Sequence, residues 1–246
     1  MPIAPAYGIL TVKSPEGRFS KLLYLYETHL HTAPVSRCAE ATPREQAKAY
    51  KERGYAGIIV TDHFLNGNTG CPKGLSWADA MTFFCSGYEA AKAEGDKLGL
   101  DVFFGLEYAV RGTEFLLYGL TPEFLFNHPG MDTLSAAQIS ALTRSAGGYV
   151  AQAHPYRSAW WIERPYPVDP GLIDGIETFN AGNFDPEINA LAHEFAELNR
   201  LPAQSGTDSH FAEQPFTGGV ALRERAGDIF DIINAIKTGR VELITP

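Results

Sequence analysis

Residues 28–31 read Thr28-His29-Leu30-His31 and come one residue after the apolar run 22–26, Leu-Leu-Tyr-Leu-Tyr. Side chains of an extended segment alternate between two faces, so His29 and His31 share one face and Leu30 turns away. Two imidazoles at one strand end can bind the same metal ion, each through one neutral nitrogen. A pair of ordinary surface or core histidines is the alternative, and the tetrapeptide alone does not decide between the two. The positions of the other candidate ligands do.

Apolar runs and amphipathic segments alternate along the chain. The sequence predicts helices that begin after Thr42 and at Trp77, a helix over 133–146, one that begins after Asp185, and a last one over 229–236. Strands alternating with helices imply right-handed crossovers and a parallel sheet. The predicted strands cover residues 22–26, 57–60, 102–106, 115–118, 149–153, 175–179, 202–206 and 241–244.

Size and charge restrict the function. A chain of 246 residues, 45% of them hydrophobic, can form one α/β barrel, and no linker or repeat divides it, so we expect a single domain over 1–246. The turn Ser14-Pro15-Glu16-Gly17 predicts an N-terminal hairpin extension over 1–22. A net charge of -9 excludes the cationic surface that duplex nucleic acid requires, but bound divalent metals would still admit a small anionic substrate.

Cysteine usage and hydropathy predict the compartment. The three cysteines are an odd number without Cys-x-x-Cys spacing, which favours reduced thiols over a disulfide framework. No stretch approaches the ~18 apolar residues of a membrane span, and the N-terminus lacks a secretory signal pattern. We therefore expect a cytoplasmic protein that does not bind membranes.

Histidines and carboxylates gather at the downstream ends of the predicted strands. In a parallel α/β barrel all these ends open on one face, where active sites are built, so residues far apart in sequence would converge in one cleft. A mixture of imidazoles and carboxylates indicates a borderline divalent ion such as zinc, manganese or iron rather than magnesium. The histidines and carboxylates at these strand ends are His29, His31, Asp62, His63, Glu107, His154, Asp208 and His210.

Five short motifs occur in order over most of the chain. They are His29-Leu30-His31, Thr61-Asp62-His63, Gly105-Leu106-Glu107, Ala153-His154-Pro155 and Gly206-Thr207-Asp208-Ser209-His210. Each is weak alone, but their order and spacing across about residues 24–220 resemble the PHP (polymerase and histidinol phosphatase) family. The resemblance implies a distorted seven-stranded (β/α) barrel, similar to a TIM barrel, with two or three divalent metal ions that hydrolyses phosphate esters.

The resemblance also implies an assignment of ligands to ions. The first ion would be bound by His29, His31, Glu107 and Asp208, the second by Glu107 and His154, and the third by His63 and His210.

This chain departs from the family pattern at two places. Arg37 stands where family members with three ions have a further histidine, and no obvious second-ion histidine follows Glu107, where Glu114 is the candidate. Two ions are therefore a firmer expectation than three. Cys38 or Glu40 are alternatives as a third-site ligand, against the simpler interpretations of a buried thiol and a surface acid.

Other residues are candidates for the substrate or for support of the metals. Arg157 and Arg37 could each bind phosphate, with a surface salt bridge as the alternative. Asn180 could orient a ligand in the pocket or cap a turn. Asp62 could tune His63 without binding metal. The aromatic residues Tyr156, Trp160, Trp161 and Tyr166 could line a pocket for a flat group or simply pack a long loop.

The sequence thus predicts a metal-dependent phosphoesterase that acts on a small phosphomonoester, such as a nucleotide, through a metal-activated hydroxide, with no side chain assigned as the catalytic base. An amidohydrolase-like enzyme that cleaves C–N bonds is one alternative, although no lysine occupies a strand end as a bridging ligand would. A metal-stabilised regulatory module without turnover is the other. The sequence leaves the oligomeric state undetermined.

Overall fold

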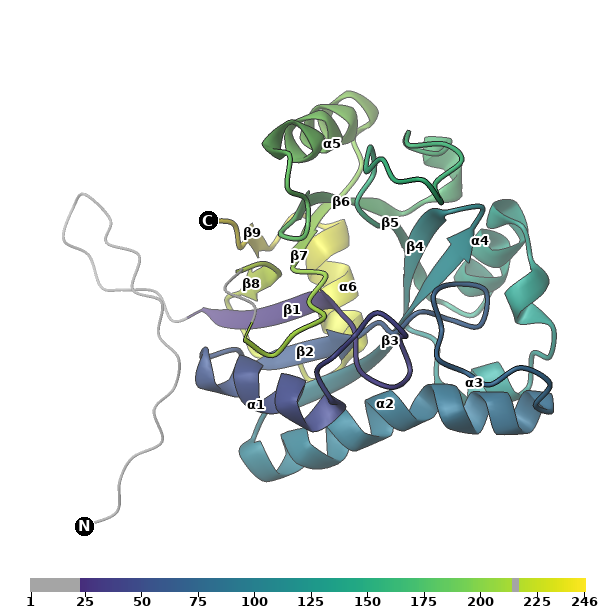
Figure 1. The fold of residues 1–246 in the computed structure, drawn as a ribbon. Coiled ribbons are helices and arrows are strands. Elements are labelled where there is room, and N and C mark those ends of the chain that lie inside the picture. The colour runs from purple at the N-terminus through teal and green to yellow at the C-terminus, as the bar shows by residue number, and fades with distance from the viewer. Residues whose placement is uncertain (1–22, 214–216) are drawn as a thin grey trace, which may run out of the picture.

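The computed structural model describes residues 23–213 and 217–246 (Figure 1). The hairpin extension predicted over residues 1–22 lies outside the described residues.

One sheet contains all the described strands, in the order β7-β6-β5-β4-β3-β2-β1-β8-β9. The neighbours in β1-β2-β3 and in β5-β6-β7 are parallel, whereas β4 is antiparallel to both of its neighbours and β8 is antiparallel to β1. The strands are β1 (Tyr24–Leu30), β2 (Gly57–Val60), β3 (Asp101–Val110), β4 (Thr113–Tyr118), β5 (Tyr149–Gln152), β6 (Gly175–Asn180), β7 (Ala203–Gly206), β8 (Val220–Leu222) and β9 (Glu242–Leu243).

The sheet curls until the segment after β7 meets β1. The backbone N–H of His31 donates to the carbonyl of Ser209 at 2.8 Å, and the N–H of Asp208 donates to the carbonyl of His29 at 2.8 Å. The result is a nearly closed, barrel-like sheet in which the ends of β1 and β7 adjoin. The predicted α/β barrel class is confirmed.

The predicted count of seven strands is wrong. The described sheet has nine strands, because β8 pairs antiparallel with β1 and β9 pairs with β8, which adds two strands beside β1. The segment of β8 is short, and no strand was expected there.

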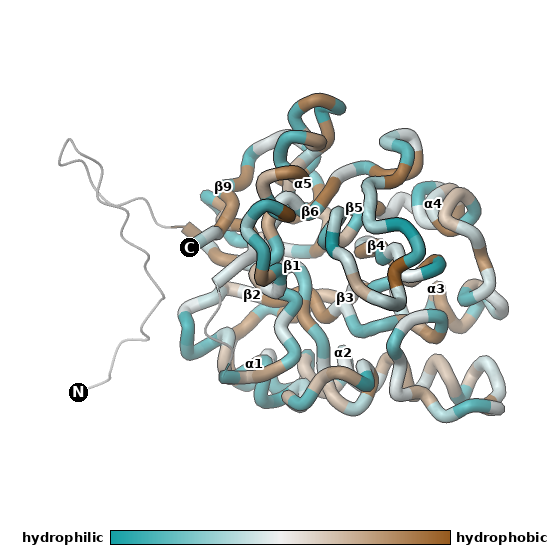
Figure 2. Tube along the Cα trace, turned by 45° about the horizontal axis from the view of Figure 1, so that its top comes forward, coloured by the Kyte–Doolittle hydropathy of each residue, from teal (hydrophilic) through white to brown (hydrophobic). Residues whose placement is uncertain are grey.

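Helices surround the sheet, and their starts follow the predicted caps. Thr42 and Glu45 form a capping box at α1, and the Asp185 side chain accepts from the Glu187 N–H at the start of α5. Hydrophilic and hydrophobic residues alternate along α1 and α2, as in amphipathic helices (Figure 2). The helices are α1 (Pro43–Glu52), α2 (Trp77–Leu98), α3 (Pro122–Phe126), α4 (Ala136–Ser145), α5 (Pro186–Asn199) and α6 (Ile229–Lys237), with 3-10 turns η1 (Met131–Thr133) and η2 (Pro170–Leu172).

The helix predicted over 133–146 is shorter than expected. Ser135 and Gln138 form a capping box, so the helix begins only at Ala136, and the preceding residues form η1. The Ser135 side chain accepts a hydrogen bond from the Gln138 N–H, and this cap fixes the start of the helix more strongly than the apolar periodicity does.

The apolar side of α6 packs against the strand ends opposite the histidines. We call this the α6 cluster; its buried members are Tyr26, Ile59, Leu116, Tyr118, Tyr149, Ala151, Ala153, Val220, Leu222, Ala226, Ile232, Ile233, Ala235 and Ile236. None of the helices in the described ranges is long and apolar enough to cross a bilayer.

Candidate metal centre

Strand β1 directs three chemically active side chains to the inside of the sheet. Glu27, His29 and His31 follow the period of two, and each is fully buried. Glu27 accepts through one carboxylate oxygen from the N–H groups of His29 and Thr207, at 2.8 and 2.9 Å, and so ties the end of β1 to the segment after β7.

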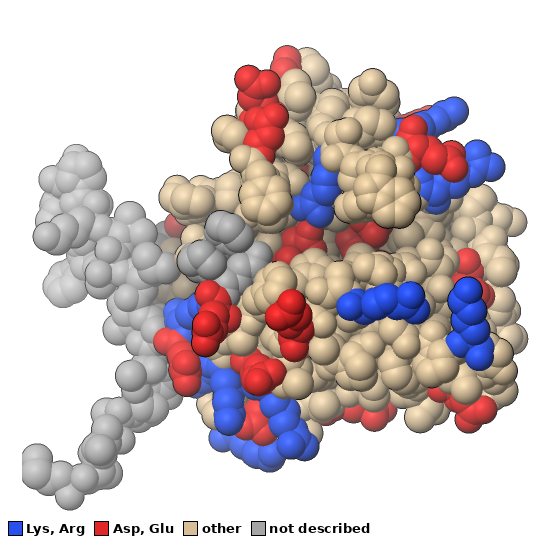
Figure 3. Space-filling view, in the orientation of Figure 1, with Lys and Arg blue, Asp and Glu red and all other residues tan. Residues whose placement is uncertain are grey.

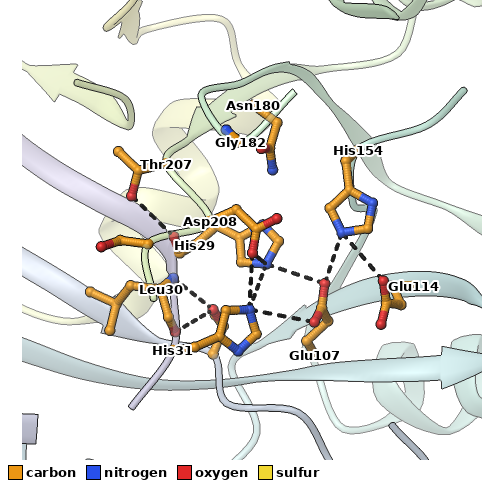
Figure 4. A network of polar contacts seen from close by, with 12 residues as sticks. His29, Leu30, His31, Glu107, Glu114, His154, Asn180, Gly182, Thr207 and Asp208 are labelled. Atoms are coloured by element: carbon orange, nitrogen blue, oxygen red, sulfur yellow. Dashed lines mark hydrogen bonds and ion pairs between the residues drawn. The ribbon is translucent and has the colours of Figure 1, made fainter. Parts of the chain in front are cut away.

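The two histidines converge with two carboxylates from other strands. The Nε2 atoms of His29 and His31 lie 3.2 Å apart. Oε1 of Glu107 lies 3.2 Å from Nε2 of His29, and Oδ1 of Asp208 lies 3.2 Å from Nε2 of His31. These four residues, which we call the first ligand set, are the ones that the family resemblance assigned to the first ion (Figure 4).

Hydrogen bonds hold both histidines with Nε2 toward this point. Nδ1 of His29 lies 3.1 Å from the Glu177 carboxylate, to which only a protonated Nδ1 can donate. Nδ1 of His31 lies 3.0 Å from the Ser36 hydroxyl, which itself donates to Asp62 at 2.7 Å. When both rings are neutral, Nε2 of His29 and Nε2 of His31 each carry a lone pair that points toward the other ring. A cation between the two rings could bind both lone pairs.

Glu107 also faces a second group of ligands. Nε2 of His154 lies 3.2 Å from Oε1 of Glu107 and 3.4 Å from Oε2 of Glu114. Nδ1 of His63 lies 2.6 Å from Oε2 of Glu107 and 3.6 Å from Oε1 of Glu114. We call Glu107, Glu114, His63 and His154 the second ligand set. In Figure 4 the Glu107 carboxylate lies between the two histidines of β1 on one side and Glu114 and His154 on the other.

A tight hairpin places the two glutamates together. Residues Arg111 and Gly112, with φ of 52° and 82°, connect β3 to β4, and positive φ at both positions is typical of a type I′ turn. Glu107 pairs with Leu116 and Ala109 pairs with Glu114, so the two carboxylates lie on the same face of the hairpin.

A third group adjoins these two. His210 follows Asp208, and its Nε2 lies 3.1 Å from Sγ of Cys38. The ligand nitrogens of His31, His63 and His210 lie within 4.8 Å of one another. The structure thus brings all seven predicted metal ligands and Glu114 into one buried region.

The donor set fits divalent cations. Nδ1 of His63 and Oε2 of Glu107 are buried and make no hydrogen bond among the described residues, although they face each other. Three carboxylates, Glu107, Glu114 and Asp208, lie against the imidazoles of the site, and a cluster of acids of this kind is stabilised when cations compensate its charge.

Electrostatic coupling separates the pKa values of the neighbouring acids. Burial favours the neutral acid, but His63 and His29 hold the pKa of Glu107 well below its usual range. Burial and then the Glu107 charge raise the pKa of Glu114. Burial disfavours the His29 imidazolium, yet Glu177 and the nearby acids raise the His29 pKa well above its usual value. Cations that bind His29 must displace its proton, so their affinity falls in acid.

Two of the ligands lie on strained backbone. Asp208 and His154 adopt φ of 55° and 26°, a left-handed region that residues other than glycine rarely occupy. The approach of β7 to β1 adds a second constraint, since a Cβ on Gly206 would lie 2.6 Å from the His29 Cβ. Such strain is common at functional sites, where surrounding contacts enforce it.

Arg157 is clamped beside the first ligand set. Its guanidinium donates to Asp208 at 2.6 Å, to Asn180 at 2.8 Å and to Asn183 at 2.9 Å. Three of its five N–H groups are thus engaged, and two remain. Asn180 is buried, accepts from the Gly182 N–H as a turn cap and donates to Glu177, so it supports the site from behind the cavity.

An open cavity of about 550 Å³ leads to the ligands. Figure 3 shows Asp and Glu residues, in red, on the floor of a hollow on this face. Trp160 and Trp161 line the cavity and are 93% and 53% exposed, so they do not pack the interior of their loop. Arg37, by contrast, is exposed and is not among the residues that line the cavity.

Sequence reasoning assigned Asp62 differently and missed three supporting residues. The Asp62 carboxylate accepts from Thr32 and Ser36, so its hydrogen bonds lead to His31 through Ser36 rather than to the His63 ring. Glu177, Ser36 and Glu27 were not predicted. For Glu27 and Glu177 the sequence did hold a signal, since each is an acid inside a mostly buried strand, and a buried carboxylate must accept hydrogen bonds from nearby donors.

Comparison with solved structures shows which known fold this chain resembles. The chain superposes over 98% of its length on 69% of a two-domain protein from Bacteroides vulgatus that contains a predicted PHP-like metal-dependent phosphoesterase, with a TM-score of 0.70 and 16% identity. This chain has the PHP fold. The resemblance in the sequence is therefore confirmed at the level of the fold.

Two further solved structures are similar to this chain in fold. A protein from Bifidobacterium adolescentis, inferred to be a metal-dependent phosphoesterase, matches with a TM-score of 0.55 and 15% identity over 88% of this chain and 96% of its own. An amidohydrolase from Chromobacterium violaceum matches with a TM-score of 0.52 and 14% identity over 89% and 97%. No family model and no curated protein sequence matches the chain.

Proposed function

We propose that this protein is a metal-dependent hydrolase of a small phosphomonoester. The observation that supports it best is the position of Glu107, whose carboxylate contacts both ligand sets. Oε1 lies 3.2 Å from Nε2 of His29 and of His154, and Oε2 lies 3.5 Å from Nε2 of His31 and 2.6 Å from Nδ1 of His63. A carboxylate shared in this way can bridge two cations, which lower the pKa of a bound water and neutralise phosphoryl oxygens. The first ligand set would bind one cation, and Glu107, Glu114 and His154 the other.

The charge of the site makes cations necessary for a phosphate substrate. Once the imidazoles are neutral, as metal binding requires, the carboxylates of Glu107, Glu114 and Asp208 outnumber the one guanidinium of Arg157, so cations must compensate this charge for a phosphate dianion to bind. His29 and Arg157 hold the pKa of Asp208 well below its usual range despite its burial, so this acid stays ionised. Two bound divalent cations would reverse the local charge.

Arg157 would orient the substrate. Its contacts with Asp208, Asn180 and Asn183 fix the guanidinium plane, and its two remaining N–H groups are available to phosphoryl oxygens. The cavity volume of about 550 Å³ lies within the range of small-molecule sites, and the exposed rings of Trp160 and Trp161 give it an apolar wall. A phosphomonoester with a flat group, such as a nucleoside monophosphate, matches both features.

C–N hydrolysis is the second candidate, because one structural relative is an amidohydrolase. The residues that line the described cavity include no lysine that could bridge two cations. The three buried acids instead supply the carboxylates of the ligand sets. We therefore favour phosphate esters.

The test is metal analysis of protein purified without chelators, combined with hydrolysis of aryl phosphates, nucleoside monophosphates and amide substrates. We expect bound cations and release of phosphate. His31→Ala should abolish hydrolysis and leave the fold intact, whereas His193→Ala, at an exposed position on α5, should retain it. Hydrolysis that survives in His31→Ala would contradict the proposal, and cations bound without turnover would favour a regulatory module.

A further inference from the structure

Three asparagines that do not line the cavity are connected to Arg157, which does. Asn180 ends β6, Asn183 lies in the loop that follows, and Asn189 lies near the start of α5. We call these three residues the asparagine set. Asparagine is an unfavourable residue inside a helix, so Asn189 is explained by its contacts outside α5 rather than by helix formation.

Hydrogen bonds fix which end of two of these amides faces the guanidinium. Nδ2 of Asn180 donates to the Glu177 carboxylate at 2.7 Å. Nδ2 of Asn183 donates to Oδ1 of Asn189 at 2.8 Å. The oxygens of Asn180 and Asn183 are therefore left for Arg157, and they accept from its Nη2 and Nε at 2.8 and 2.9 Å. An amide turned the other way would place its NH₂ group against the cationic guanidinium.

Asn189 holds both of the other members of the set. Its Oδ1 accepts from the Asn183 side chain and, at 3.1 Å, from the backbone N–H of Asn180. Its Nδ2 donates to the Asn180 carbonyl at 3.3 Å. One half-buried side chain on α5 thus binds the loop between β6 and α5 at three points, and these bonds determine where the two oxygens that face Arg157 lie.

We propose that Asn189 is a positioning residue for phosphate binding: it holds the Asn180 and Asn183 oxygens against Arg157, so that the guanidinium meets a phosphoryl group in one fixed orientation. A guanidinium that is already fixed loses less conformational freedom when phosphate binds. Without the Asn189 amide, the Asn183 side chain can turn, and Arg157 binds phosphate less tightly. This inference rests on the proposed function, in which Arg157 binds phosphoryl oxygens.

The test compares Asn189→Leu with the wild type, both saturated with the same divalent cation. Leucine is similar in size and has a higher helix propensity, so α5 should remain intact. Calorimetry gives the dissociation constant of inorganic phosphate, and steady-state kinetics with an aryl phosphate give KM and kcat. We expect the dissociation constant and KM to rise about tenfold, kcat to change less than about threefold, and metal content to stay the same. Asn199→Leu, at the exposed end of the same helix, is the control and should match the wild type.

Three further variants distinguish positioning from a purely structural role. Asn189→Asp keeps the acceptor for Asn183 and should restore KM to within about threefold of the wild type. In an Arg157→Ala background, Asn189→Leu should cause no further loss of phosphate affinity, because the group that it positions is absent. Asn183→Ala, in the loop, should weaken phosphate binding as Asn189→Leu does, and it takes the place of the leucine variant if that protein does not fold.

Equal losses of phosphate affinity with and without the Arg157 side chain would overturn the inference, and so would a fall in kcat at unchanged affinity. Both results would leave the proposed function standing. A wild-type protein that binds phosphate but hydrolyses no phosphate ester would refute the proposed function, while weaker phosphate binding in Asn189→Leu would still support the inference. A wild-type protein that neither binds phosphate nor hydrolyses its esters would refute both.

Discussion

The two ends of the barrel are stabilised by opposite means. The end with the histidines buries carboxylates and imidazoles, includes polar atoms without hydrogen bonds and has residues with positive φ. The other end is filled by the α6 cluster, which is apolar apart from its tyrosine hydroxyls. Apolar burial at one end can offset the electrostatic and conformational cost at the other. We therefore expect stability and chemistry to be separable in this protein, and the following experiments test that expectation.

The largest effect is expected from Glu107→Gln. Loss of the shared carboxylate charge should prevent cation binding in both ligand sets and abolish hydrolysis, while the α6 cluster keeps the protein folded. Metal content, activity and thermal unfolding with and without Zn²⁺ measure this; Zn²⁺ should raise the unfolding temperature of the wild type but not that of Glu107→Gln. Glu52→Gln, at an exposed position on α1, is the control. A Glu107→Gln protein that retained two cations would disprove the bridging role.

The converse experiment is Ile232→Ala at the apolar end. Ile232 is fully buried in the α6 cluster, so the substitution should lower the free energy of unfolding by about 2–5 kcal/mol. Below the unfolding transition, kcat should not change. Urea unfolding and steady-state kinetics check the two expectations, with Leu198→Ala, whose side chain is 76% exposed, as the control. A large fall in kcat would show that the ends are coupled.

A smaller effect is expected from Glu177→Gln. Its carboxylate accepts hydrogen bonds from the His29 ring, the His154 N–H and the Asn180 amide. The NH₂ group of a glutamine would place a donor against one of these donors, and that hydrogen bond would be lost. Because the residue orients His29 without binding metal, we expect cation affinity to fall about 10–100-fold. Competition with a chromophoric chelator measures this affinity. Unchanged affinity would show that β1 alone fixes the His29 ring.

The smallest effect concerns the pH dependence of the metal-free protein. Burial raises the pKa of Glu27 to about 7, even though backbone N–H groups of Thr207 and His29 oppose the shift. The folded state then holds a proton that the unfolded chain has lost, so stability should fall as pH rises from the unfolded value, about 4.5, through about 7. Urea unfolding from pH 4 to 8 should show this decline in the wild type and a flatter profile in Glu27→Gln. Identical slopes would contradict it.

Local signals predicted much of the barrel. Thr42 and Asp185 fix helix starts through their own hydrogen bonds, and the apolar run 57–60 could only be a buried strand, so these elements agree with the structure. The ligands converge because strand ends meet on one face, which alternating elements already imply.

What the sequence did not predict depends on pairing between distant segments. The antiparallel direction of β4 and the pairing of β8 with β1 are not encoded in either segment alone. Glu177 acts through His29, which is 148 residues away in sequence, and Ser36 links Asp62 to His31 only because the loop after β1 folds back. Long-range contacts of this kind leave no local periodicity.

The reversed direction of β4 has a consequence for the spacing of the two proposed cations. Glu107 and Glu114 belong to one hairpin with a two-residue turn, so their separation depends on local register and not on closure of the sheet. An inserted residue in that turn would displace one acid relative to the other and leave the remaining ligands where they are. A short insertion or deletion in this turn would therefore change the distance between the two proposed cations. Such a change is a simple route by which proteins of this architecture could acquire different reactions.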